Sequence, residues 1–143
     1  LRILIIDDNE ELRSMLGNIL EGLGYTVRST DKAKDALSII ERGDADLCLL
    51  DLKMPGVTGF ELLKVIRRRH LPIPIIVVSA YISQDAAQEL AEIGVQGMVA
   101  KPFKKDRIDE SRRSPKSIWC ASDRVHTTLT GGWAKACPLL LYA

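Results

Sequence analysis

Short apolar runs alternate with segments of helical spacing along most of this chain, and this alternation restricts the possible folds more than any other feature of the sequence. The pattern is typical of βαβ units, in which parallel strands are joined by helices that cover the sheet. The run at 25–29 is the most polar, which suits an edge strand. We therefore predict an α/β protein with a parallel sheet, whose strands are residues 2–6, 25–29, 47–50, 73–78 and 97–100.

The segments between these runs place apolar residues on one face of a helix. We expect amphipathic helices over residues 12–23, 31–41, 60–69 and 84–93. Thr30 or Asp31 has a side chain suited to cap the second of them. The fourth has a thin, alanine-rich apolar stripe, which predicts a looser element.

The pattern weakens towards the C-terminus. Residues 104–117 contain Ile108 as their only apolar residue, and Pro115 interrupts any helix there. A composition of 46% apolar and 27% charged residues is that of a single globular domain. We predict one domain over residues 1–105, followed by an irregular tail at 106–143. This tail is either a degraded fifth helix or sequence encoded by a vector or a shifted reading frame.

Charge and hydropathy exclude several classes of protein. The net charge of +1 argues against nucleic-acid binding through this chain, because such binding usually needs a basic face. No apolar run approaches the roughly 18 residues that span a bilayer, so no membrane partner is expected. The three cysteines are odd in number and lack metal-ligand spacing, which predicts reduced thiols and a cytoplasmic location. The oligomeric state, monomer or dimer, stays open.

Polar side chains stand where four of the expected strands end. Asp7 and Asp8 follow the first strand, Asp51 the third, Ser79 the fourth and Lys101 the fifth. In open α/β sheets, ligands bind beyond the carboxyl ends of the strands. We therefore predict that these side chains line one site.

Three carboxylates at one edge of a sheet repel each other and need a compensating cation. Mg²⁺ suits such a site, because it binds carboxylate, water and phosphoryl oxygens. Lys101 adds a fixed positive charge and Ser79 a hydroxyl, so the site is organised to hold a phosphoryl group beside Asp51. Carboxylates act as covalent phosphoryl acceptors, which makes Asp51 the expected nucleophile.

Each of these residues also has a structural explanation. Asp8 or Asn9 is suited to cap the first helix, and Asp51 to form an Asx-turn. Ser79 alone fits a loop hydroxyl, and Lys101 alone fits a solvated side chain. The coincidence of all four sets at strand ends favours the functional interpretation.

Four segments resemble the receiver domain of bacterial response regulators of the chemotaxis-regulator type: ILIIDDNEELR, LCLLDLKMPGVTGFELL, IPIIVVSAY and GMVAKPF. The resemblance covers about residues 1–105. It implies a flavodoxin-like, doubly wound sheet of five parallel strands in the order 2-1-3-4-5. It also implies the phosphoacceptor of a two-component system, which changes conformation when a sensor histidine kinase or a histidine phosphotransfer protein phosphorylates it.

The same resemblance assigns roles to individual residues. It implies that Asp51 is the phosphoacceptor, that Lys101 contacts the phosphoryl group and that Ser79 is the switch hydroxyl. The peptide bond between Lys101 and Pro102 would be cis, which is a minority isomer elsewhere. The implied Mg²⁺ ligands are Asp7, Asp8, Asp51 and the backbone carbonyl of Lys53.

Three further residues, Met98, Lys53 and Tyr81, flank this site. Met98 lies three positions before Lys101, where similar receivers usually carry an aromatic switch residue. Methionine is flexible and packs in many environments, so Met98 is either a switch residue or a core filler. Lys53 and Tyr81 lie two positions after Asp51 and Ser79, and similar receivers place these positions beside the path of attacking water.

Two other functions stay open. One is a regulatory fragment of a larger DNA-binding regulator or hybrid kinase. The other is a small-molecule phosphohydrolase, since such enzymes also combine an aspartyl nucleophile with Mg²⁺. Those enzymes usually have a second acid two residues after the nucleophile, where this chain has Lys53. We therefore expect a signalling domain that promotes its own phosphorylation and dephosphorylation, and not a turnover enzyme.

Overall fold

The computed structural model describes residues 1–101. The predicted tail at 106–143 lies outside the described residues, and so does Pro102 with the peptide bond predicted to be cis. No helix within residues 1–101 has the length and hydropathy needed to cross a membrane. Along the chain the elements are β1 (Arg2–Ile6), α1 (Glu10–Gly22), β2 (Thr26–Thr30), α2 (Ala33–Glu41), β3 (Leu47–Asp51), α3 (Gly59–Arg68), β4 (Ile75–Ser79), α4 (Gln84–Ile93) and β5 (Gly97–Ala100).

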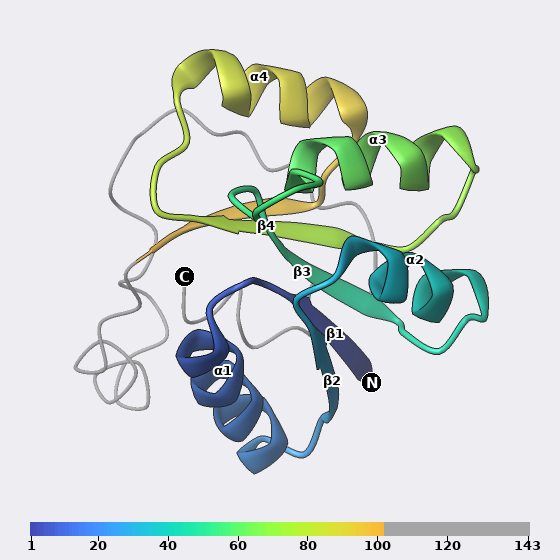
Figure 1. Cartoon of the computed structure of the whole chain (residues 1–143), viewed down its shortest axis with the longest axis vertical. Coiled ribbons are helices and arrows are strands. Elements are labelled where there is room, and N and C mark those ends of the chain that lie inside the picture. Colours follow the sequence, from blue (N-terminus) through green and yellow to red (C-terminus); the bar gives the residue numbers. More distant parts are fainter. Residues whose placement is uncertain (102–143) are drawn as a thin grey trace.

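The strands form one parallel sheet in the order β2-β1-β3-β4-β5, which confirms the predicted topology and places β2 at an edge. Ile5 of β1 lies opposite Ser29 of β2 and Leu49 of β3. Helix α1 covers one face of the sheet, and α2, α3 and α4 cover the other (Figure 1). Because all these strands run in the same direction, their carboxyl ends meet at one edge of the sheet.

Alternation of side chains along the strands divides the core into two clusters. Leu4 and Ile6 of β1 pack in the cluster beneath α2, α3 and α4. Ile3 and Ile5 pack in the cluster beneath α1. Strands β3 and β4 are buried along their whole length, as expected for central strands covered on both faces.

Strand β4 begins at Ile75, two residues later than the sequence predicts. Pro72 and Pro74 precede it, and a proline has no N–H to donate to the strand ladder. The first N–H of β4, that of Ile75, donates to the side-chain oxygen of Gln96 at 2.7 Å. The prolines therefore delay the start of the strand.

The prediction that Thr30 or Asp31 caps α2 is wrong. Thr30 is the last residue of β2 and is paired there with Ile6. The chain therefore leaves the sheet too late for Thr30 to occupy the capping position of α2. Helix α2 begins after Lys32, whose side chain makes no capping hydrogen bond. The hydroxyl of Thr30 instead accepts from the N–H of Lys32 at 3.1 Å. The other three helices are capped by the side chains of Asn9, Thr58 and Ser83.

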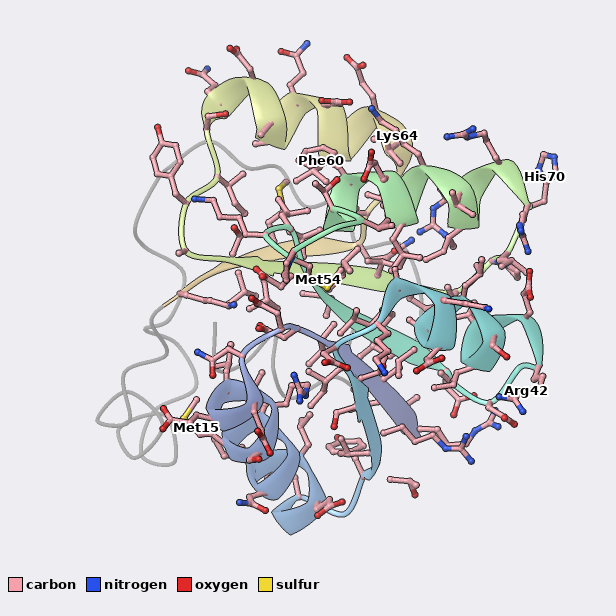
Figure 2. All side chains as sticks on the ribbon, in the orientation of Figure 1. Met15, Arg42, Met54, Phe60, Lys64 and His70 are labelled. Atoms are coloured by element: carbon pink, nitrogen blue, oxygen red, sulfur yellow. The ribbon has the colours of Figure 1, made fainter. Side chains whose placement is uncertain are left out.

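Helix α3 ends in a turn that places His70 in the left-handed region, with a φ of 54°. His70 is exposed and lies beyond the last turn of the helix (Figure 2). Its N–H donates to the carbonyl of Arg67 at 3.0 Å, and the N–H of Leu71 donates to the carbonyl of Ile66 at 3.2 Å. Glycine is the usual residue at this position of a helix terminus, because it has no Cβ.

We expect His70→Gly to raise the free energy of unfolding by about 0.5 kcal/mol. The left-handed conformation costs a residue with a Cβ roughly 1 kcal/mol, and the greater freedom of glycine in the unfolded chain offsets part of the gain. Urea denaturation measures the change. His70→Ala is the control, since it keeps the Cβ and should show no gain; a destabilised glycine variant would contradict the prediction.

Candidate functional site

The edge formed by the carboxyl ends of the strands brings together the residues that the sequence predicts for the site. Asp7 directly follows β1, Asp51 ends β3, Ser79 ends β4 and Lys101 directly follows β5. Asp7, Asp51 and Ser79 are 2%, 4% and 0% exposed, and no other polar or charged residue within residues 1–101 is buried to this degree. Burying a polar group is unfavourable unless the group is paired, so these three buried residues need hydrogen-bond or ion-pair partners at this edge.

Lys101 links the two buried acids. Its Nζ lies 2.7 Å from Oδ2 of Asp7 and 3.3 Å from Oδ1 of Asp51. The side chain of Lys101 is 18% exposed, and those of Asp7 and Asp51 are 3% and 5% exposed. The ammonium therefore compensates two carboxylates in a region that water barely reaches.

The pKa of Asp51 is raised above its ordinary value. Burial is the main cause, because it penalises the charged carboxylate, and repulsion from Asp7 acts in the same direction. The ammonium of Lys101 opposes the shift, as does a hydrogen bond from the backbone N–H of Lys53. An additional cation at this site would stabilise the ionised form of Asp51.

The acids at this edge have the chemistry of a magnesium site. Asp7, Asp8 and Asp51 each offer a carboxylate oxygen, and these oxygens lie within 4.8 Å of one another. Asp8 is exposed, while the other two are buried. Three carboxylates outnumber the single ammonium of Lys101, so the cluster keeps an excess of negative charge. Oxygen ligands in such a cluster fit Mg²⁺, which prefers carboxylates and water.

The loops after β3 and β4 border the site. The Ser79 hydroxyl donates to the backbone carbonyl of Tyr81 at 3.3 Å. The side chain of Tyr81 is 71% exposed, and Lys53 is also exposed. Met98 is half-buried and packs against the cluster beneath α2, α3 and α4, a position that both of its predicted roles allow.

Two further residues support the site, and no motif in the sequence singled them out. Arg13 of α1 donates from Nη1 to the backbone carbonyl of Asp7 at 2.7 Å. Gly59, the first residue of α3, packs so closely against β3 that an added Cβ would lie 2.7 Å from Cα of Leu52 and would overlap the carbonyl of Asp51. Both lie inside the segments that resemble receiver domains, which was the only signal available for them.

Comparisons with known proteins agree on one family. The chain matches the model of the response regulator receiver domain over residues 3–113. It is 35% identical over 113 residues to the chemotaxis protein CheY of Pseudomonas aeruginosa, an alignment that covers 77% of this chain and 91% of that protein. It is 36% identical over 110 residues to sporulation initiation phosphotransferase F of Bacillus subtilis, with 77% and 89% covered. The chain therefore belongs to the receiver domains of response regulators.

Solved structures agree with this assignment. The chemotaxis protein CheY4 of Vibrio cholerae superposes with a TM-score of 0.68 at 27% identity, covering 78% of this chain and 95% of that chain. The response regulator TrrA of Thermotoga maritima, in complex with Mg²⁺ and BeF, superposes with a TM-score of 0.64 at 30% identity, covering 78% and 96%. The predicted flavodoxin-like receiver fold is confirmed.

Proposed function

We propose that this receiver domain, assigned to residues 1–105, accepts a phosphoryl group on Asp51 from the phosphohistidine of a sensor histidine kinase or a histidine phosphotransfer protein. The observation that carries the proposal is the burial of Asp51 beside the Lys101 ammonium, with Asp7 and Asp8 at the same edge. The domain works in the cytoplasm as a signalling component and does not turn over small phosphate esters. Its output depends on which of two conformations is populated.

The acidic cluster is the proposed Mg²⁺ site. Asp7, Asp8 and Asp51 would supply carboxylate oxygens, and the backbone carbonyl of Lys53 would complete the protein ligands. When bound, Mg²⁺ supplies positive charge that neutralises the phosphoryl oxygens during transfer. The three carboxylates support this assignment, because they exceed the positive charge that Lys101 provides.

The transfer itself is a substitution at phosphorus. A carboxylate oxygen of Asp51 forms a bond to phosphorus while the bond from phosphorus to the donor imidazole nitrogen breaks, and the electron pair of that bond leaves with the imidazole. Lys101 is placed to contact the phosphoryl oxygens as charge develops on them, since its Nζ already lies 3.3 Å from Asp51. Acetyl phosphate would serve as a small donor, because its phosphorus–oxygen bond breaks in the same way and acetate leaves with the electron pair.

Ser79 is the proposed switch. Its buried hydroxyl donates to the Tyr81 carbonyl, which holds the loop after β4 in its present position. A phosphoryl oxygen on Asp51 would be a stronger, charged acceptor for the same hydroxyl. The hydroxyl would then leave the Tyr81 carbonyl and allow the loop to move. Met98, which packs against the cluster beneath α2, α3 and α4, is proposed as a second switch residue.

Labelling by acetyl phosphate tests the acceptor. Intact mass in the presence of Mg²⁺ should increase by one phosphoryl group in the wild type and stay unchanged in Asp51→Asn, because an amide is a poor nucleophile. Asp85→Asn is the matched control, since Asp85 lies in the first turn of α4. Full labelling of Asp51→Asn, or loss of labelling in Asp85→Asn, would contradict the assignment of Asp51.

The lifetime of the phosphoryl group is expected to depend on Lys53 and Tyr81. Both are exposed beside the site, where a long cation and a bulky phenol hinder an attacking water. We expect hydrolysis of the phosphorylated protein to become several-fold faster in Tyr81→Ala and in Lys53→Asn, measured as the decay of the phosphorylated mass after the donor is removed. Unchanged decay in both variants would show that neither side chain controls access of water.

A further inference from the structure

Every polar group of Asp7 forms a hydrogen bond. Its N–H donates to the Thr30 carbonyl at 3.2 Å, and its Oδ1 accepts from the N–H of Asn9 at 2.9 Å. Its Oδ2 accepts from Lys101 at 2.7 Å, and its carbonyl accepts from Arg13 at 2.7 Å. These partners come from β2, the turn before α1, the end of β5 and α1 itself. Four different segments of the chain therefore hold Asp7 in position.

Asn9 and Lys101 hold the carboxylate of Asp7, whereas Arg13 bonds its backbone carbonyl. Arg13 is half-buried on α1, one turn after the capping residue Asn9, and its own N–H donates to the Asn9 carbonyl at 3.0 Å. Its guanidinium donates to the carbonyl of Asp7, and no ion pair with an acid is formed by Arg13 within residues 1–101. What Arg13 fixes is the peptide plane between Asp7 and Asp8.

This peptide plane sets the position of Asp8. A peptide unit is planar, so a bond to the carbonyl of Asp7 also orients the nitrogen and Cα of Asp8. The carboxylate of Asp8 is exposed and accepts no hydrogen bond from any other group within residues 1–101. Its location in the cluster therefore depends on its backbone and not on partners of its own.

We propose that Arg13 is a positioning residue for the magnesium site, acting through the Asp7–Asp8 peptide. The inference rests on the proposed function, because it assumes that Asp7 and Asp8 supply metal ligands. Groups that orient the ligands of a metal typically change its affinity by about 10-fold to 100-fold when they are removed. Arg13 holds two ligand residues through one hydrogen bond, so its loss should weaken binding of Mg²⁺.

The charge of Arg13 has the opposite effect, and this makes the inference testable. A guanidinium near a cation site repels the cation, so a role of Arg13 limited to its charge predicts tighter Mg²⁺ binding when it is removed. A positioning role predicts weaker binding. Arg13→Met and Arg13→Gln remove the charge, whereas Arg13→Lys keeps the charge and a donor. A single nitrogen makes the contact, so lysine can replace it although it lacks the planar fork of arginine.

Isothermal titration of Mg²⁺ into the full chain, without any phosphodonor, decides between these outcomes. We expect the dissociation constant to rise about 10-fold in Arg13→Met and Arg13→Gln and to return to within about threefold of the wild type in Arg13→Lys. Arg28→Met is the control for net charge, because Arg28 is exposed and pairs with Asp44. Urea denaturation without Mg²⁺ verifies that each variant is folded at the temperature of the titration.

Unchanged or tighter binding in Arg13→Met and Arg13→Gln would overturn the positioning role. An equal loss in Arg28→Met would also overturn it, since the weaker binding would then not be specific to the residue that contacts the Asp7 carbonyl. Absence of Mg²⁺ binding in the wild type would overturn the proposed metal site itself, together with the inference. Weaker binding in the neutral variants with recovery in Arg13→Lys supports the inference.

Discussion

Replacing Lys101 with methionine is expected to lower the free energy of unfolding by about 3 kcal/mol at neutral pH without Mg²⁺. The Lys101 ammonium lies 2.7 Å from Asp7 and 3.3 Å from Asp51, and both acids are buried. Without the ammonium, two buried carboxylates face each other with no cation between them. A loss of this size is a large part of the roughly 5–15 kcal/mol that stabilises most domains.

The stability lost in Lys101→Met should decrease as the pH falls. Because the pKa of Asp51 is raised, the folded protein binds a proton more tightly than the unfolded chain does. The contribution of this group to stability is therefore full below a pH of about 4 and falls as the pH rises through its folded pKa. Lys101 lowers the pKa of Asp51, so its removal raises that pKa further. The deficit of Lys101→Met should shrink as the pH falls towards 4.

Added Mg²⁺ should reduce the same deficit. A ligand that binds only the folded form stabilises it by mass action, and the loss of the ammonium leaves more negative charge for Mg²⁺ to neutralise. Urea denaturation at pH 7 and pH 5, with and without Mg²⁺, measures both effects. A deficit that grows on acidification, or one that Mg²⁺ leaves unchanged, would contradict the compensation of charge by Lys101.

Lys64→Met is the matched control for the lysine. Its Nζ lies 2.7 Å from Glu89 and 5.9 Å from the centre of the Phe60 ring, on the surface between α3 and α4 (Figure 2). The side chains of Lys64 and Glu89 are 46% and 48% exposed, so water screens their interaction. We expect this variant to lose less than about 1 kcal/mol. Equal losses in the two lysine variants would show that burial does not distinguish the two ion pairs.

Gly59→Ala is expected to have the second large effect. A Cβ at this position would overlap the carbonyl of Asp51 and lie 2.7 Å from Cα of Leu52, and both neighbours are backbone atoms that cannot move aside alone. The N–H of Gly59 also donates to the Leu52 carbonyl at 3.1 Å, so the start of α3 is tied to the end of β3. We expect a loss of about 3 kcal/mol in the free energy of unfolding, because the helix and the strand must separate.

The same substitution should impair phosphorylation. Asp51 supplies the backbone that the new Cβ would displace, so the acceptor carboxylate would move relative to Lys101 and the other acids. A displacement of about 1 Å at a reacting group reduces a rate by about 100-fold. The rate of labelling by acetyl phosphate, measured on protein that circular dichroism shows to be folded, tests this expectation.

Gly17→Ala is the control for adding a methyl group. Gly17 lies within α1, and a Cβ there would have Val27 Cγ1 as its nearest neighbour at 4.0 Å. Alanine favours the helix over glycine, so we expect a gain of about 0.5–1 kcal/mol and an unchanged rate of labelling. A stable Gly59→Ala that is phosphorylated at the normal rate would contradict the close approach of α3 to Asp51.

Local pattern was enough to predict the strands and helices along the chain, whereas the order of the strands in the sheet was implied by the resemblance to receiver domains. The periods of apolar residues separate strands from helices, and the polarity of β2 correctly indicated an edge strand. The predicted boundaries of α2 and β4 were wrong where a residue suits one element by itself but its neighbours favour another arrangement. Thr30 is a good capping residue, yet it remains in the sheet opposite Ile6. Ile73 is β-branched and apolar, yet Pro74 follows it and delays the start of β4 until Ile75.

The amino-acid pattern alone places acids, a hydroxyl and a lysine at the ends of the predicted strands, because the residues adjacent to one another are enough to indicate where a strand ends. Which of these groups are in contact depends on how the distant parts of the chain pack together. Lys101 reaches Asp7 across 94 positions of the chain, and Gly59 meets the backbone of Asp51 because α3 folds back over β3. Arg13 likewise reaches the Asp7 carbonyl only because α1 turns back along β1. Such contacts depend on strand order and helix packing, to which residues from the whole domain contribute together.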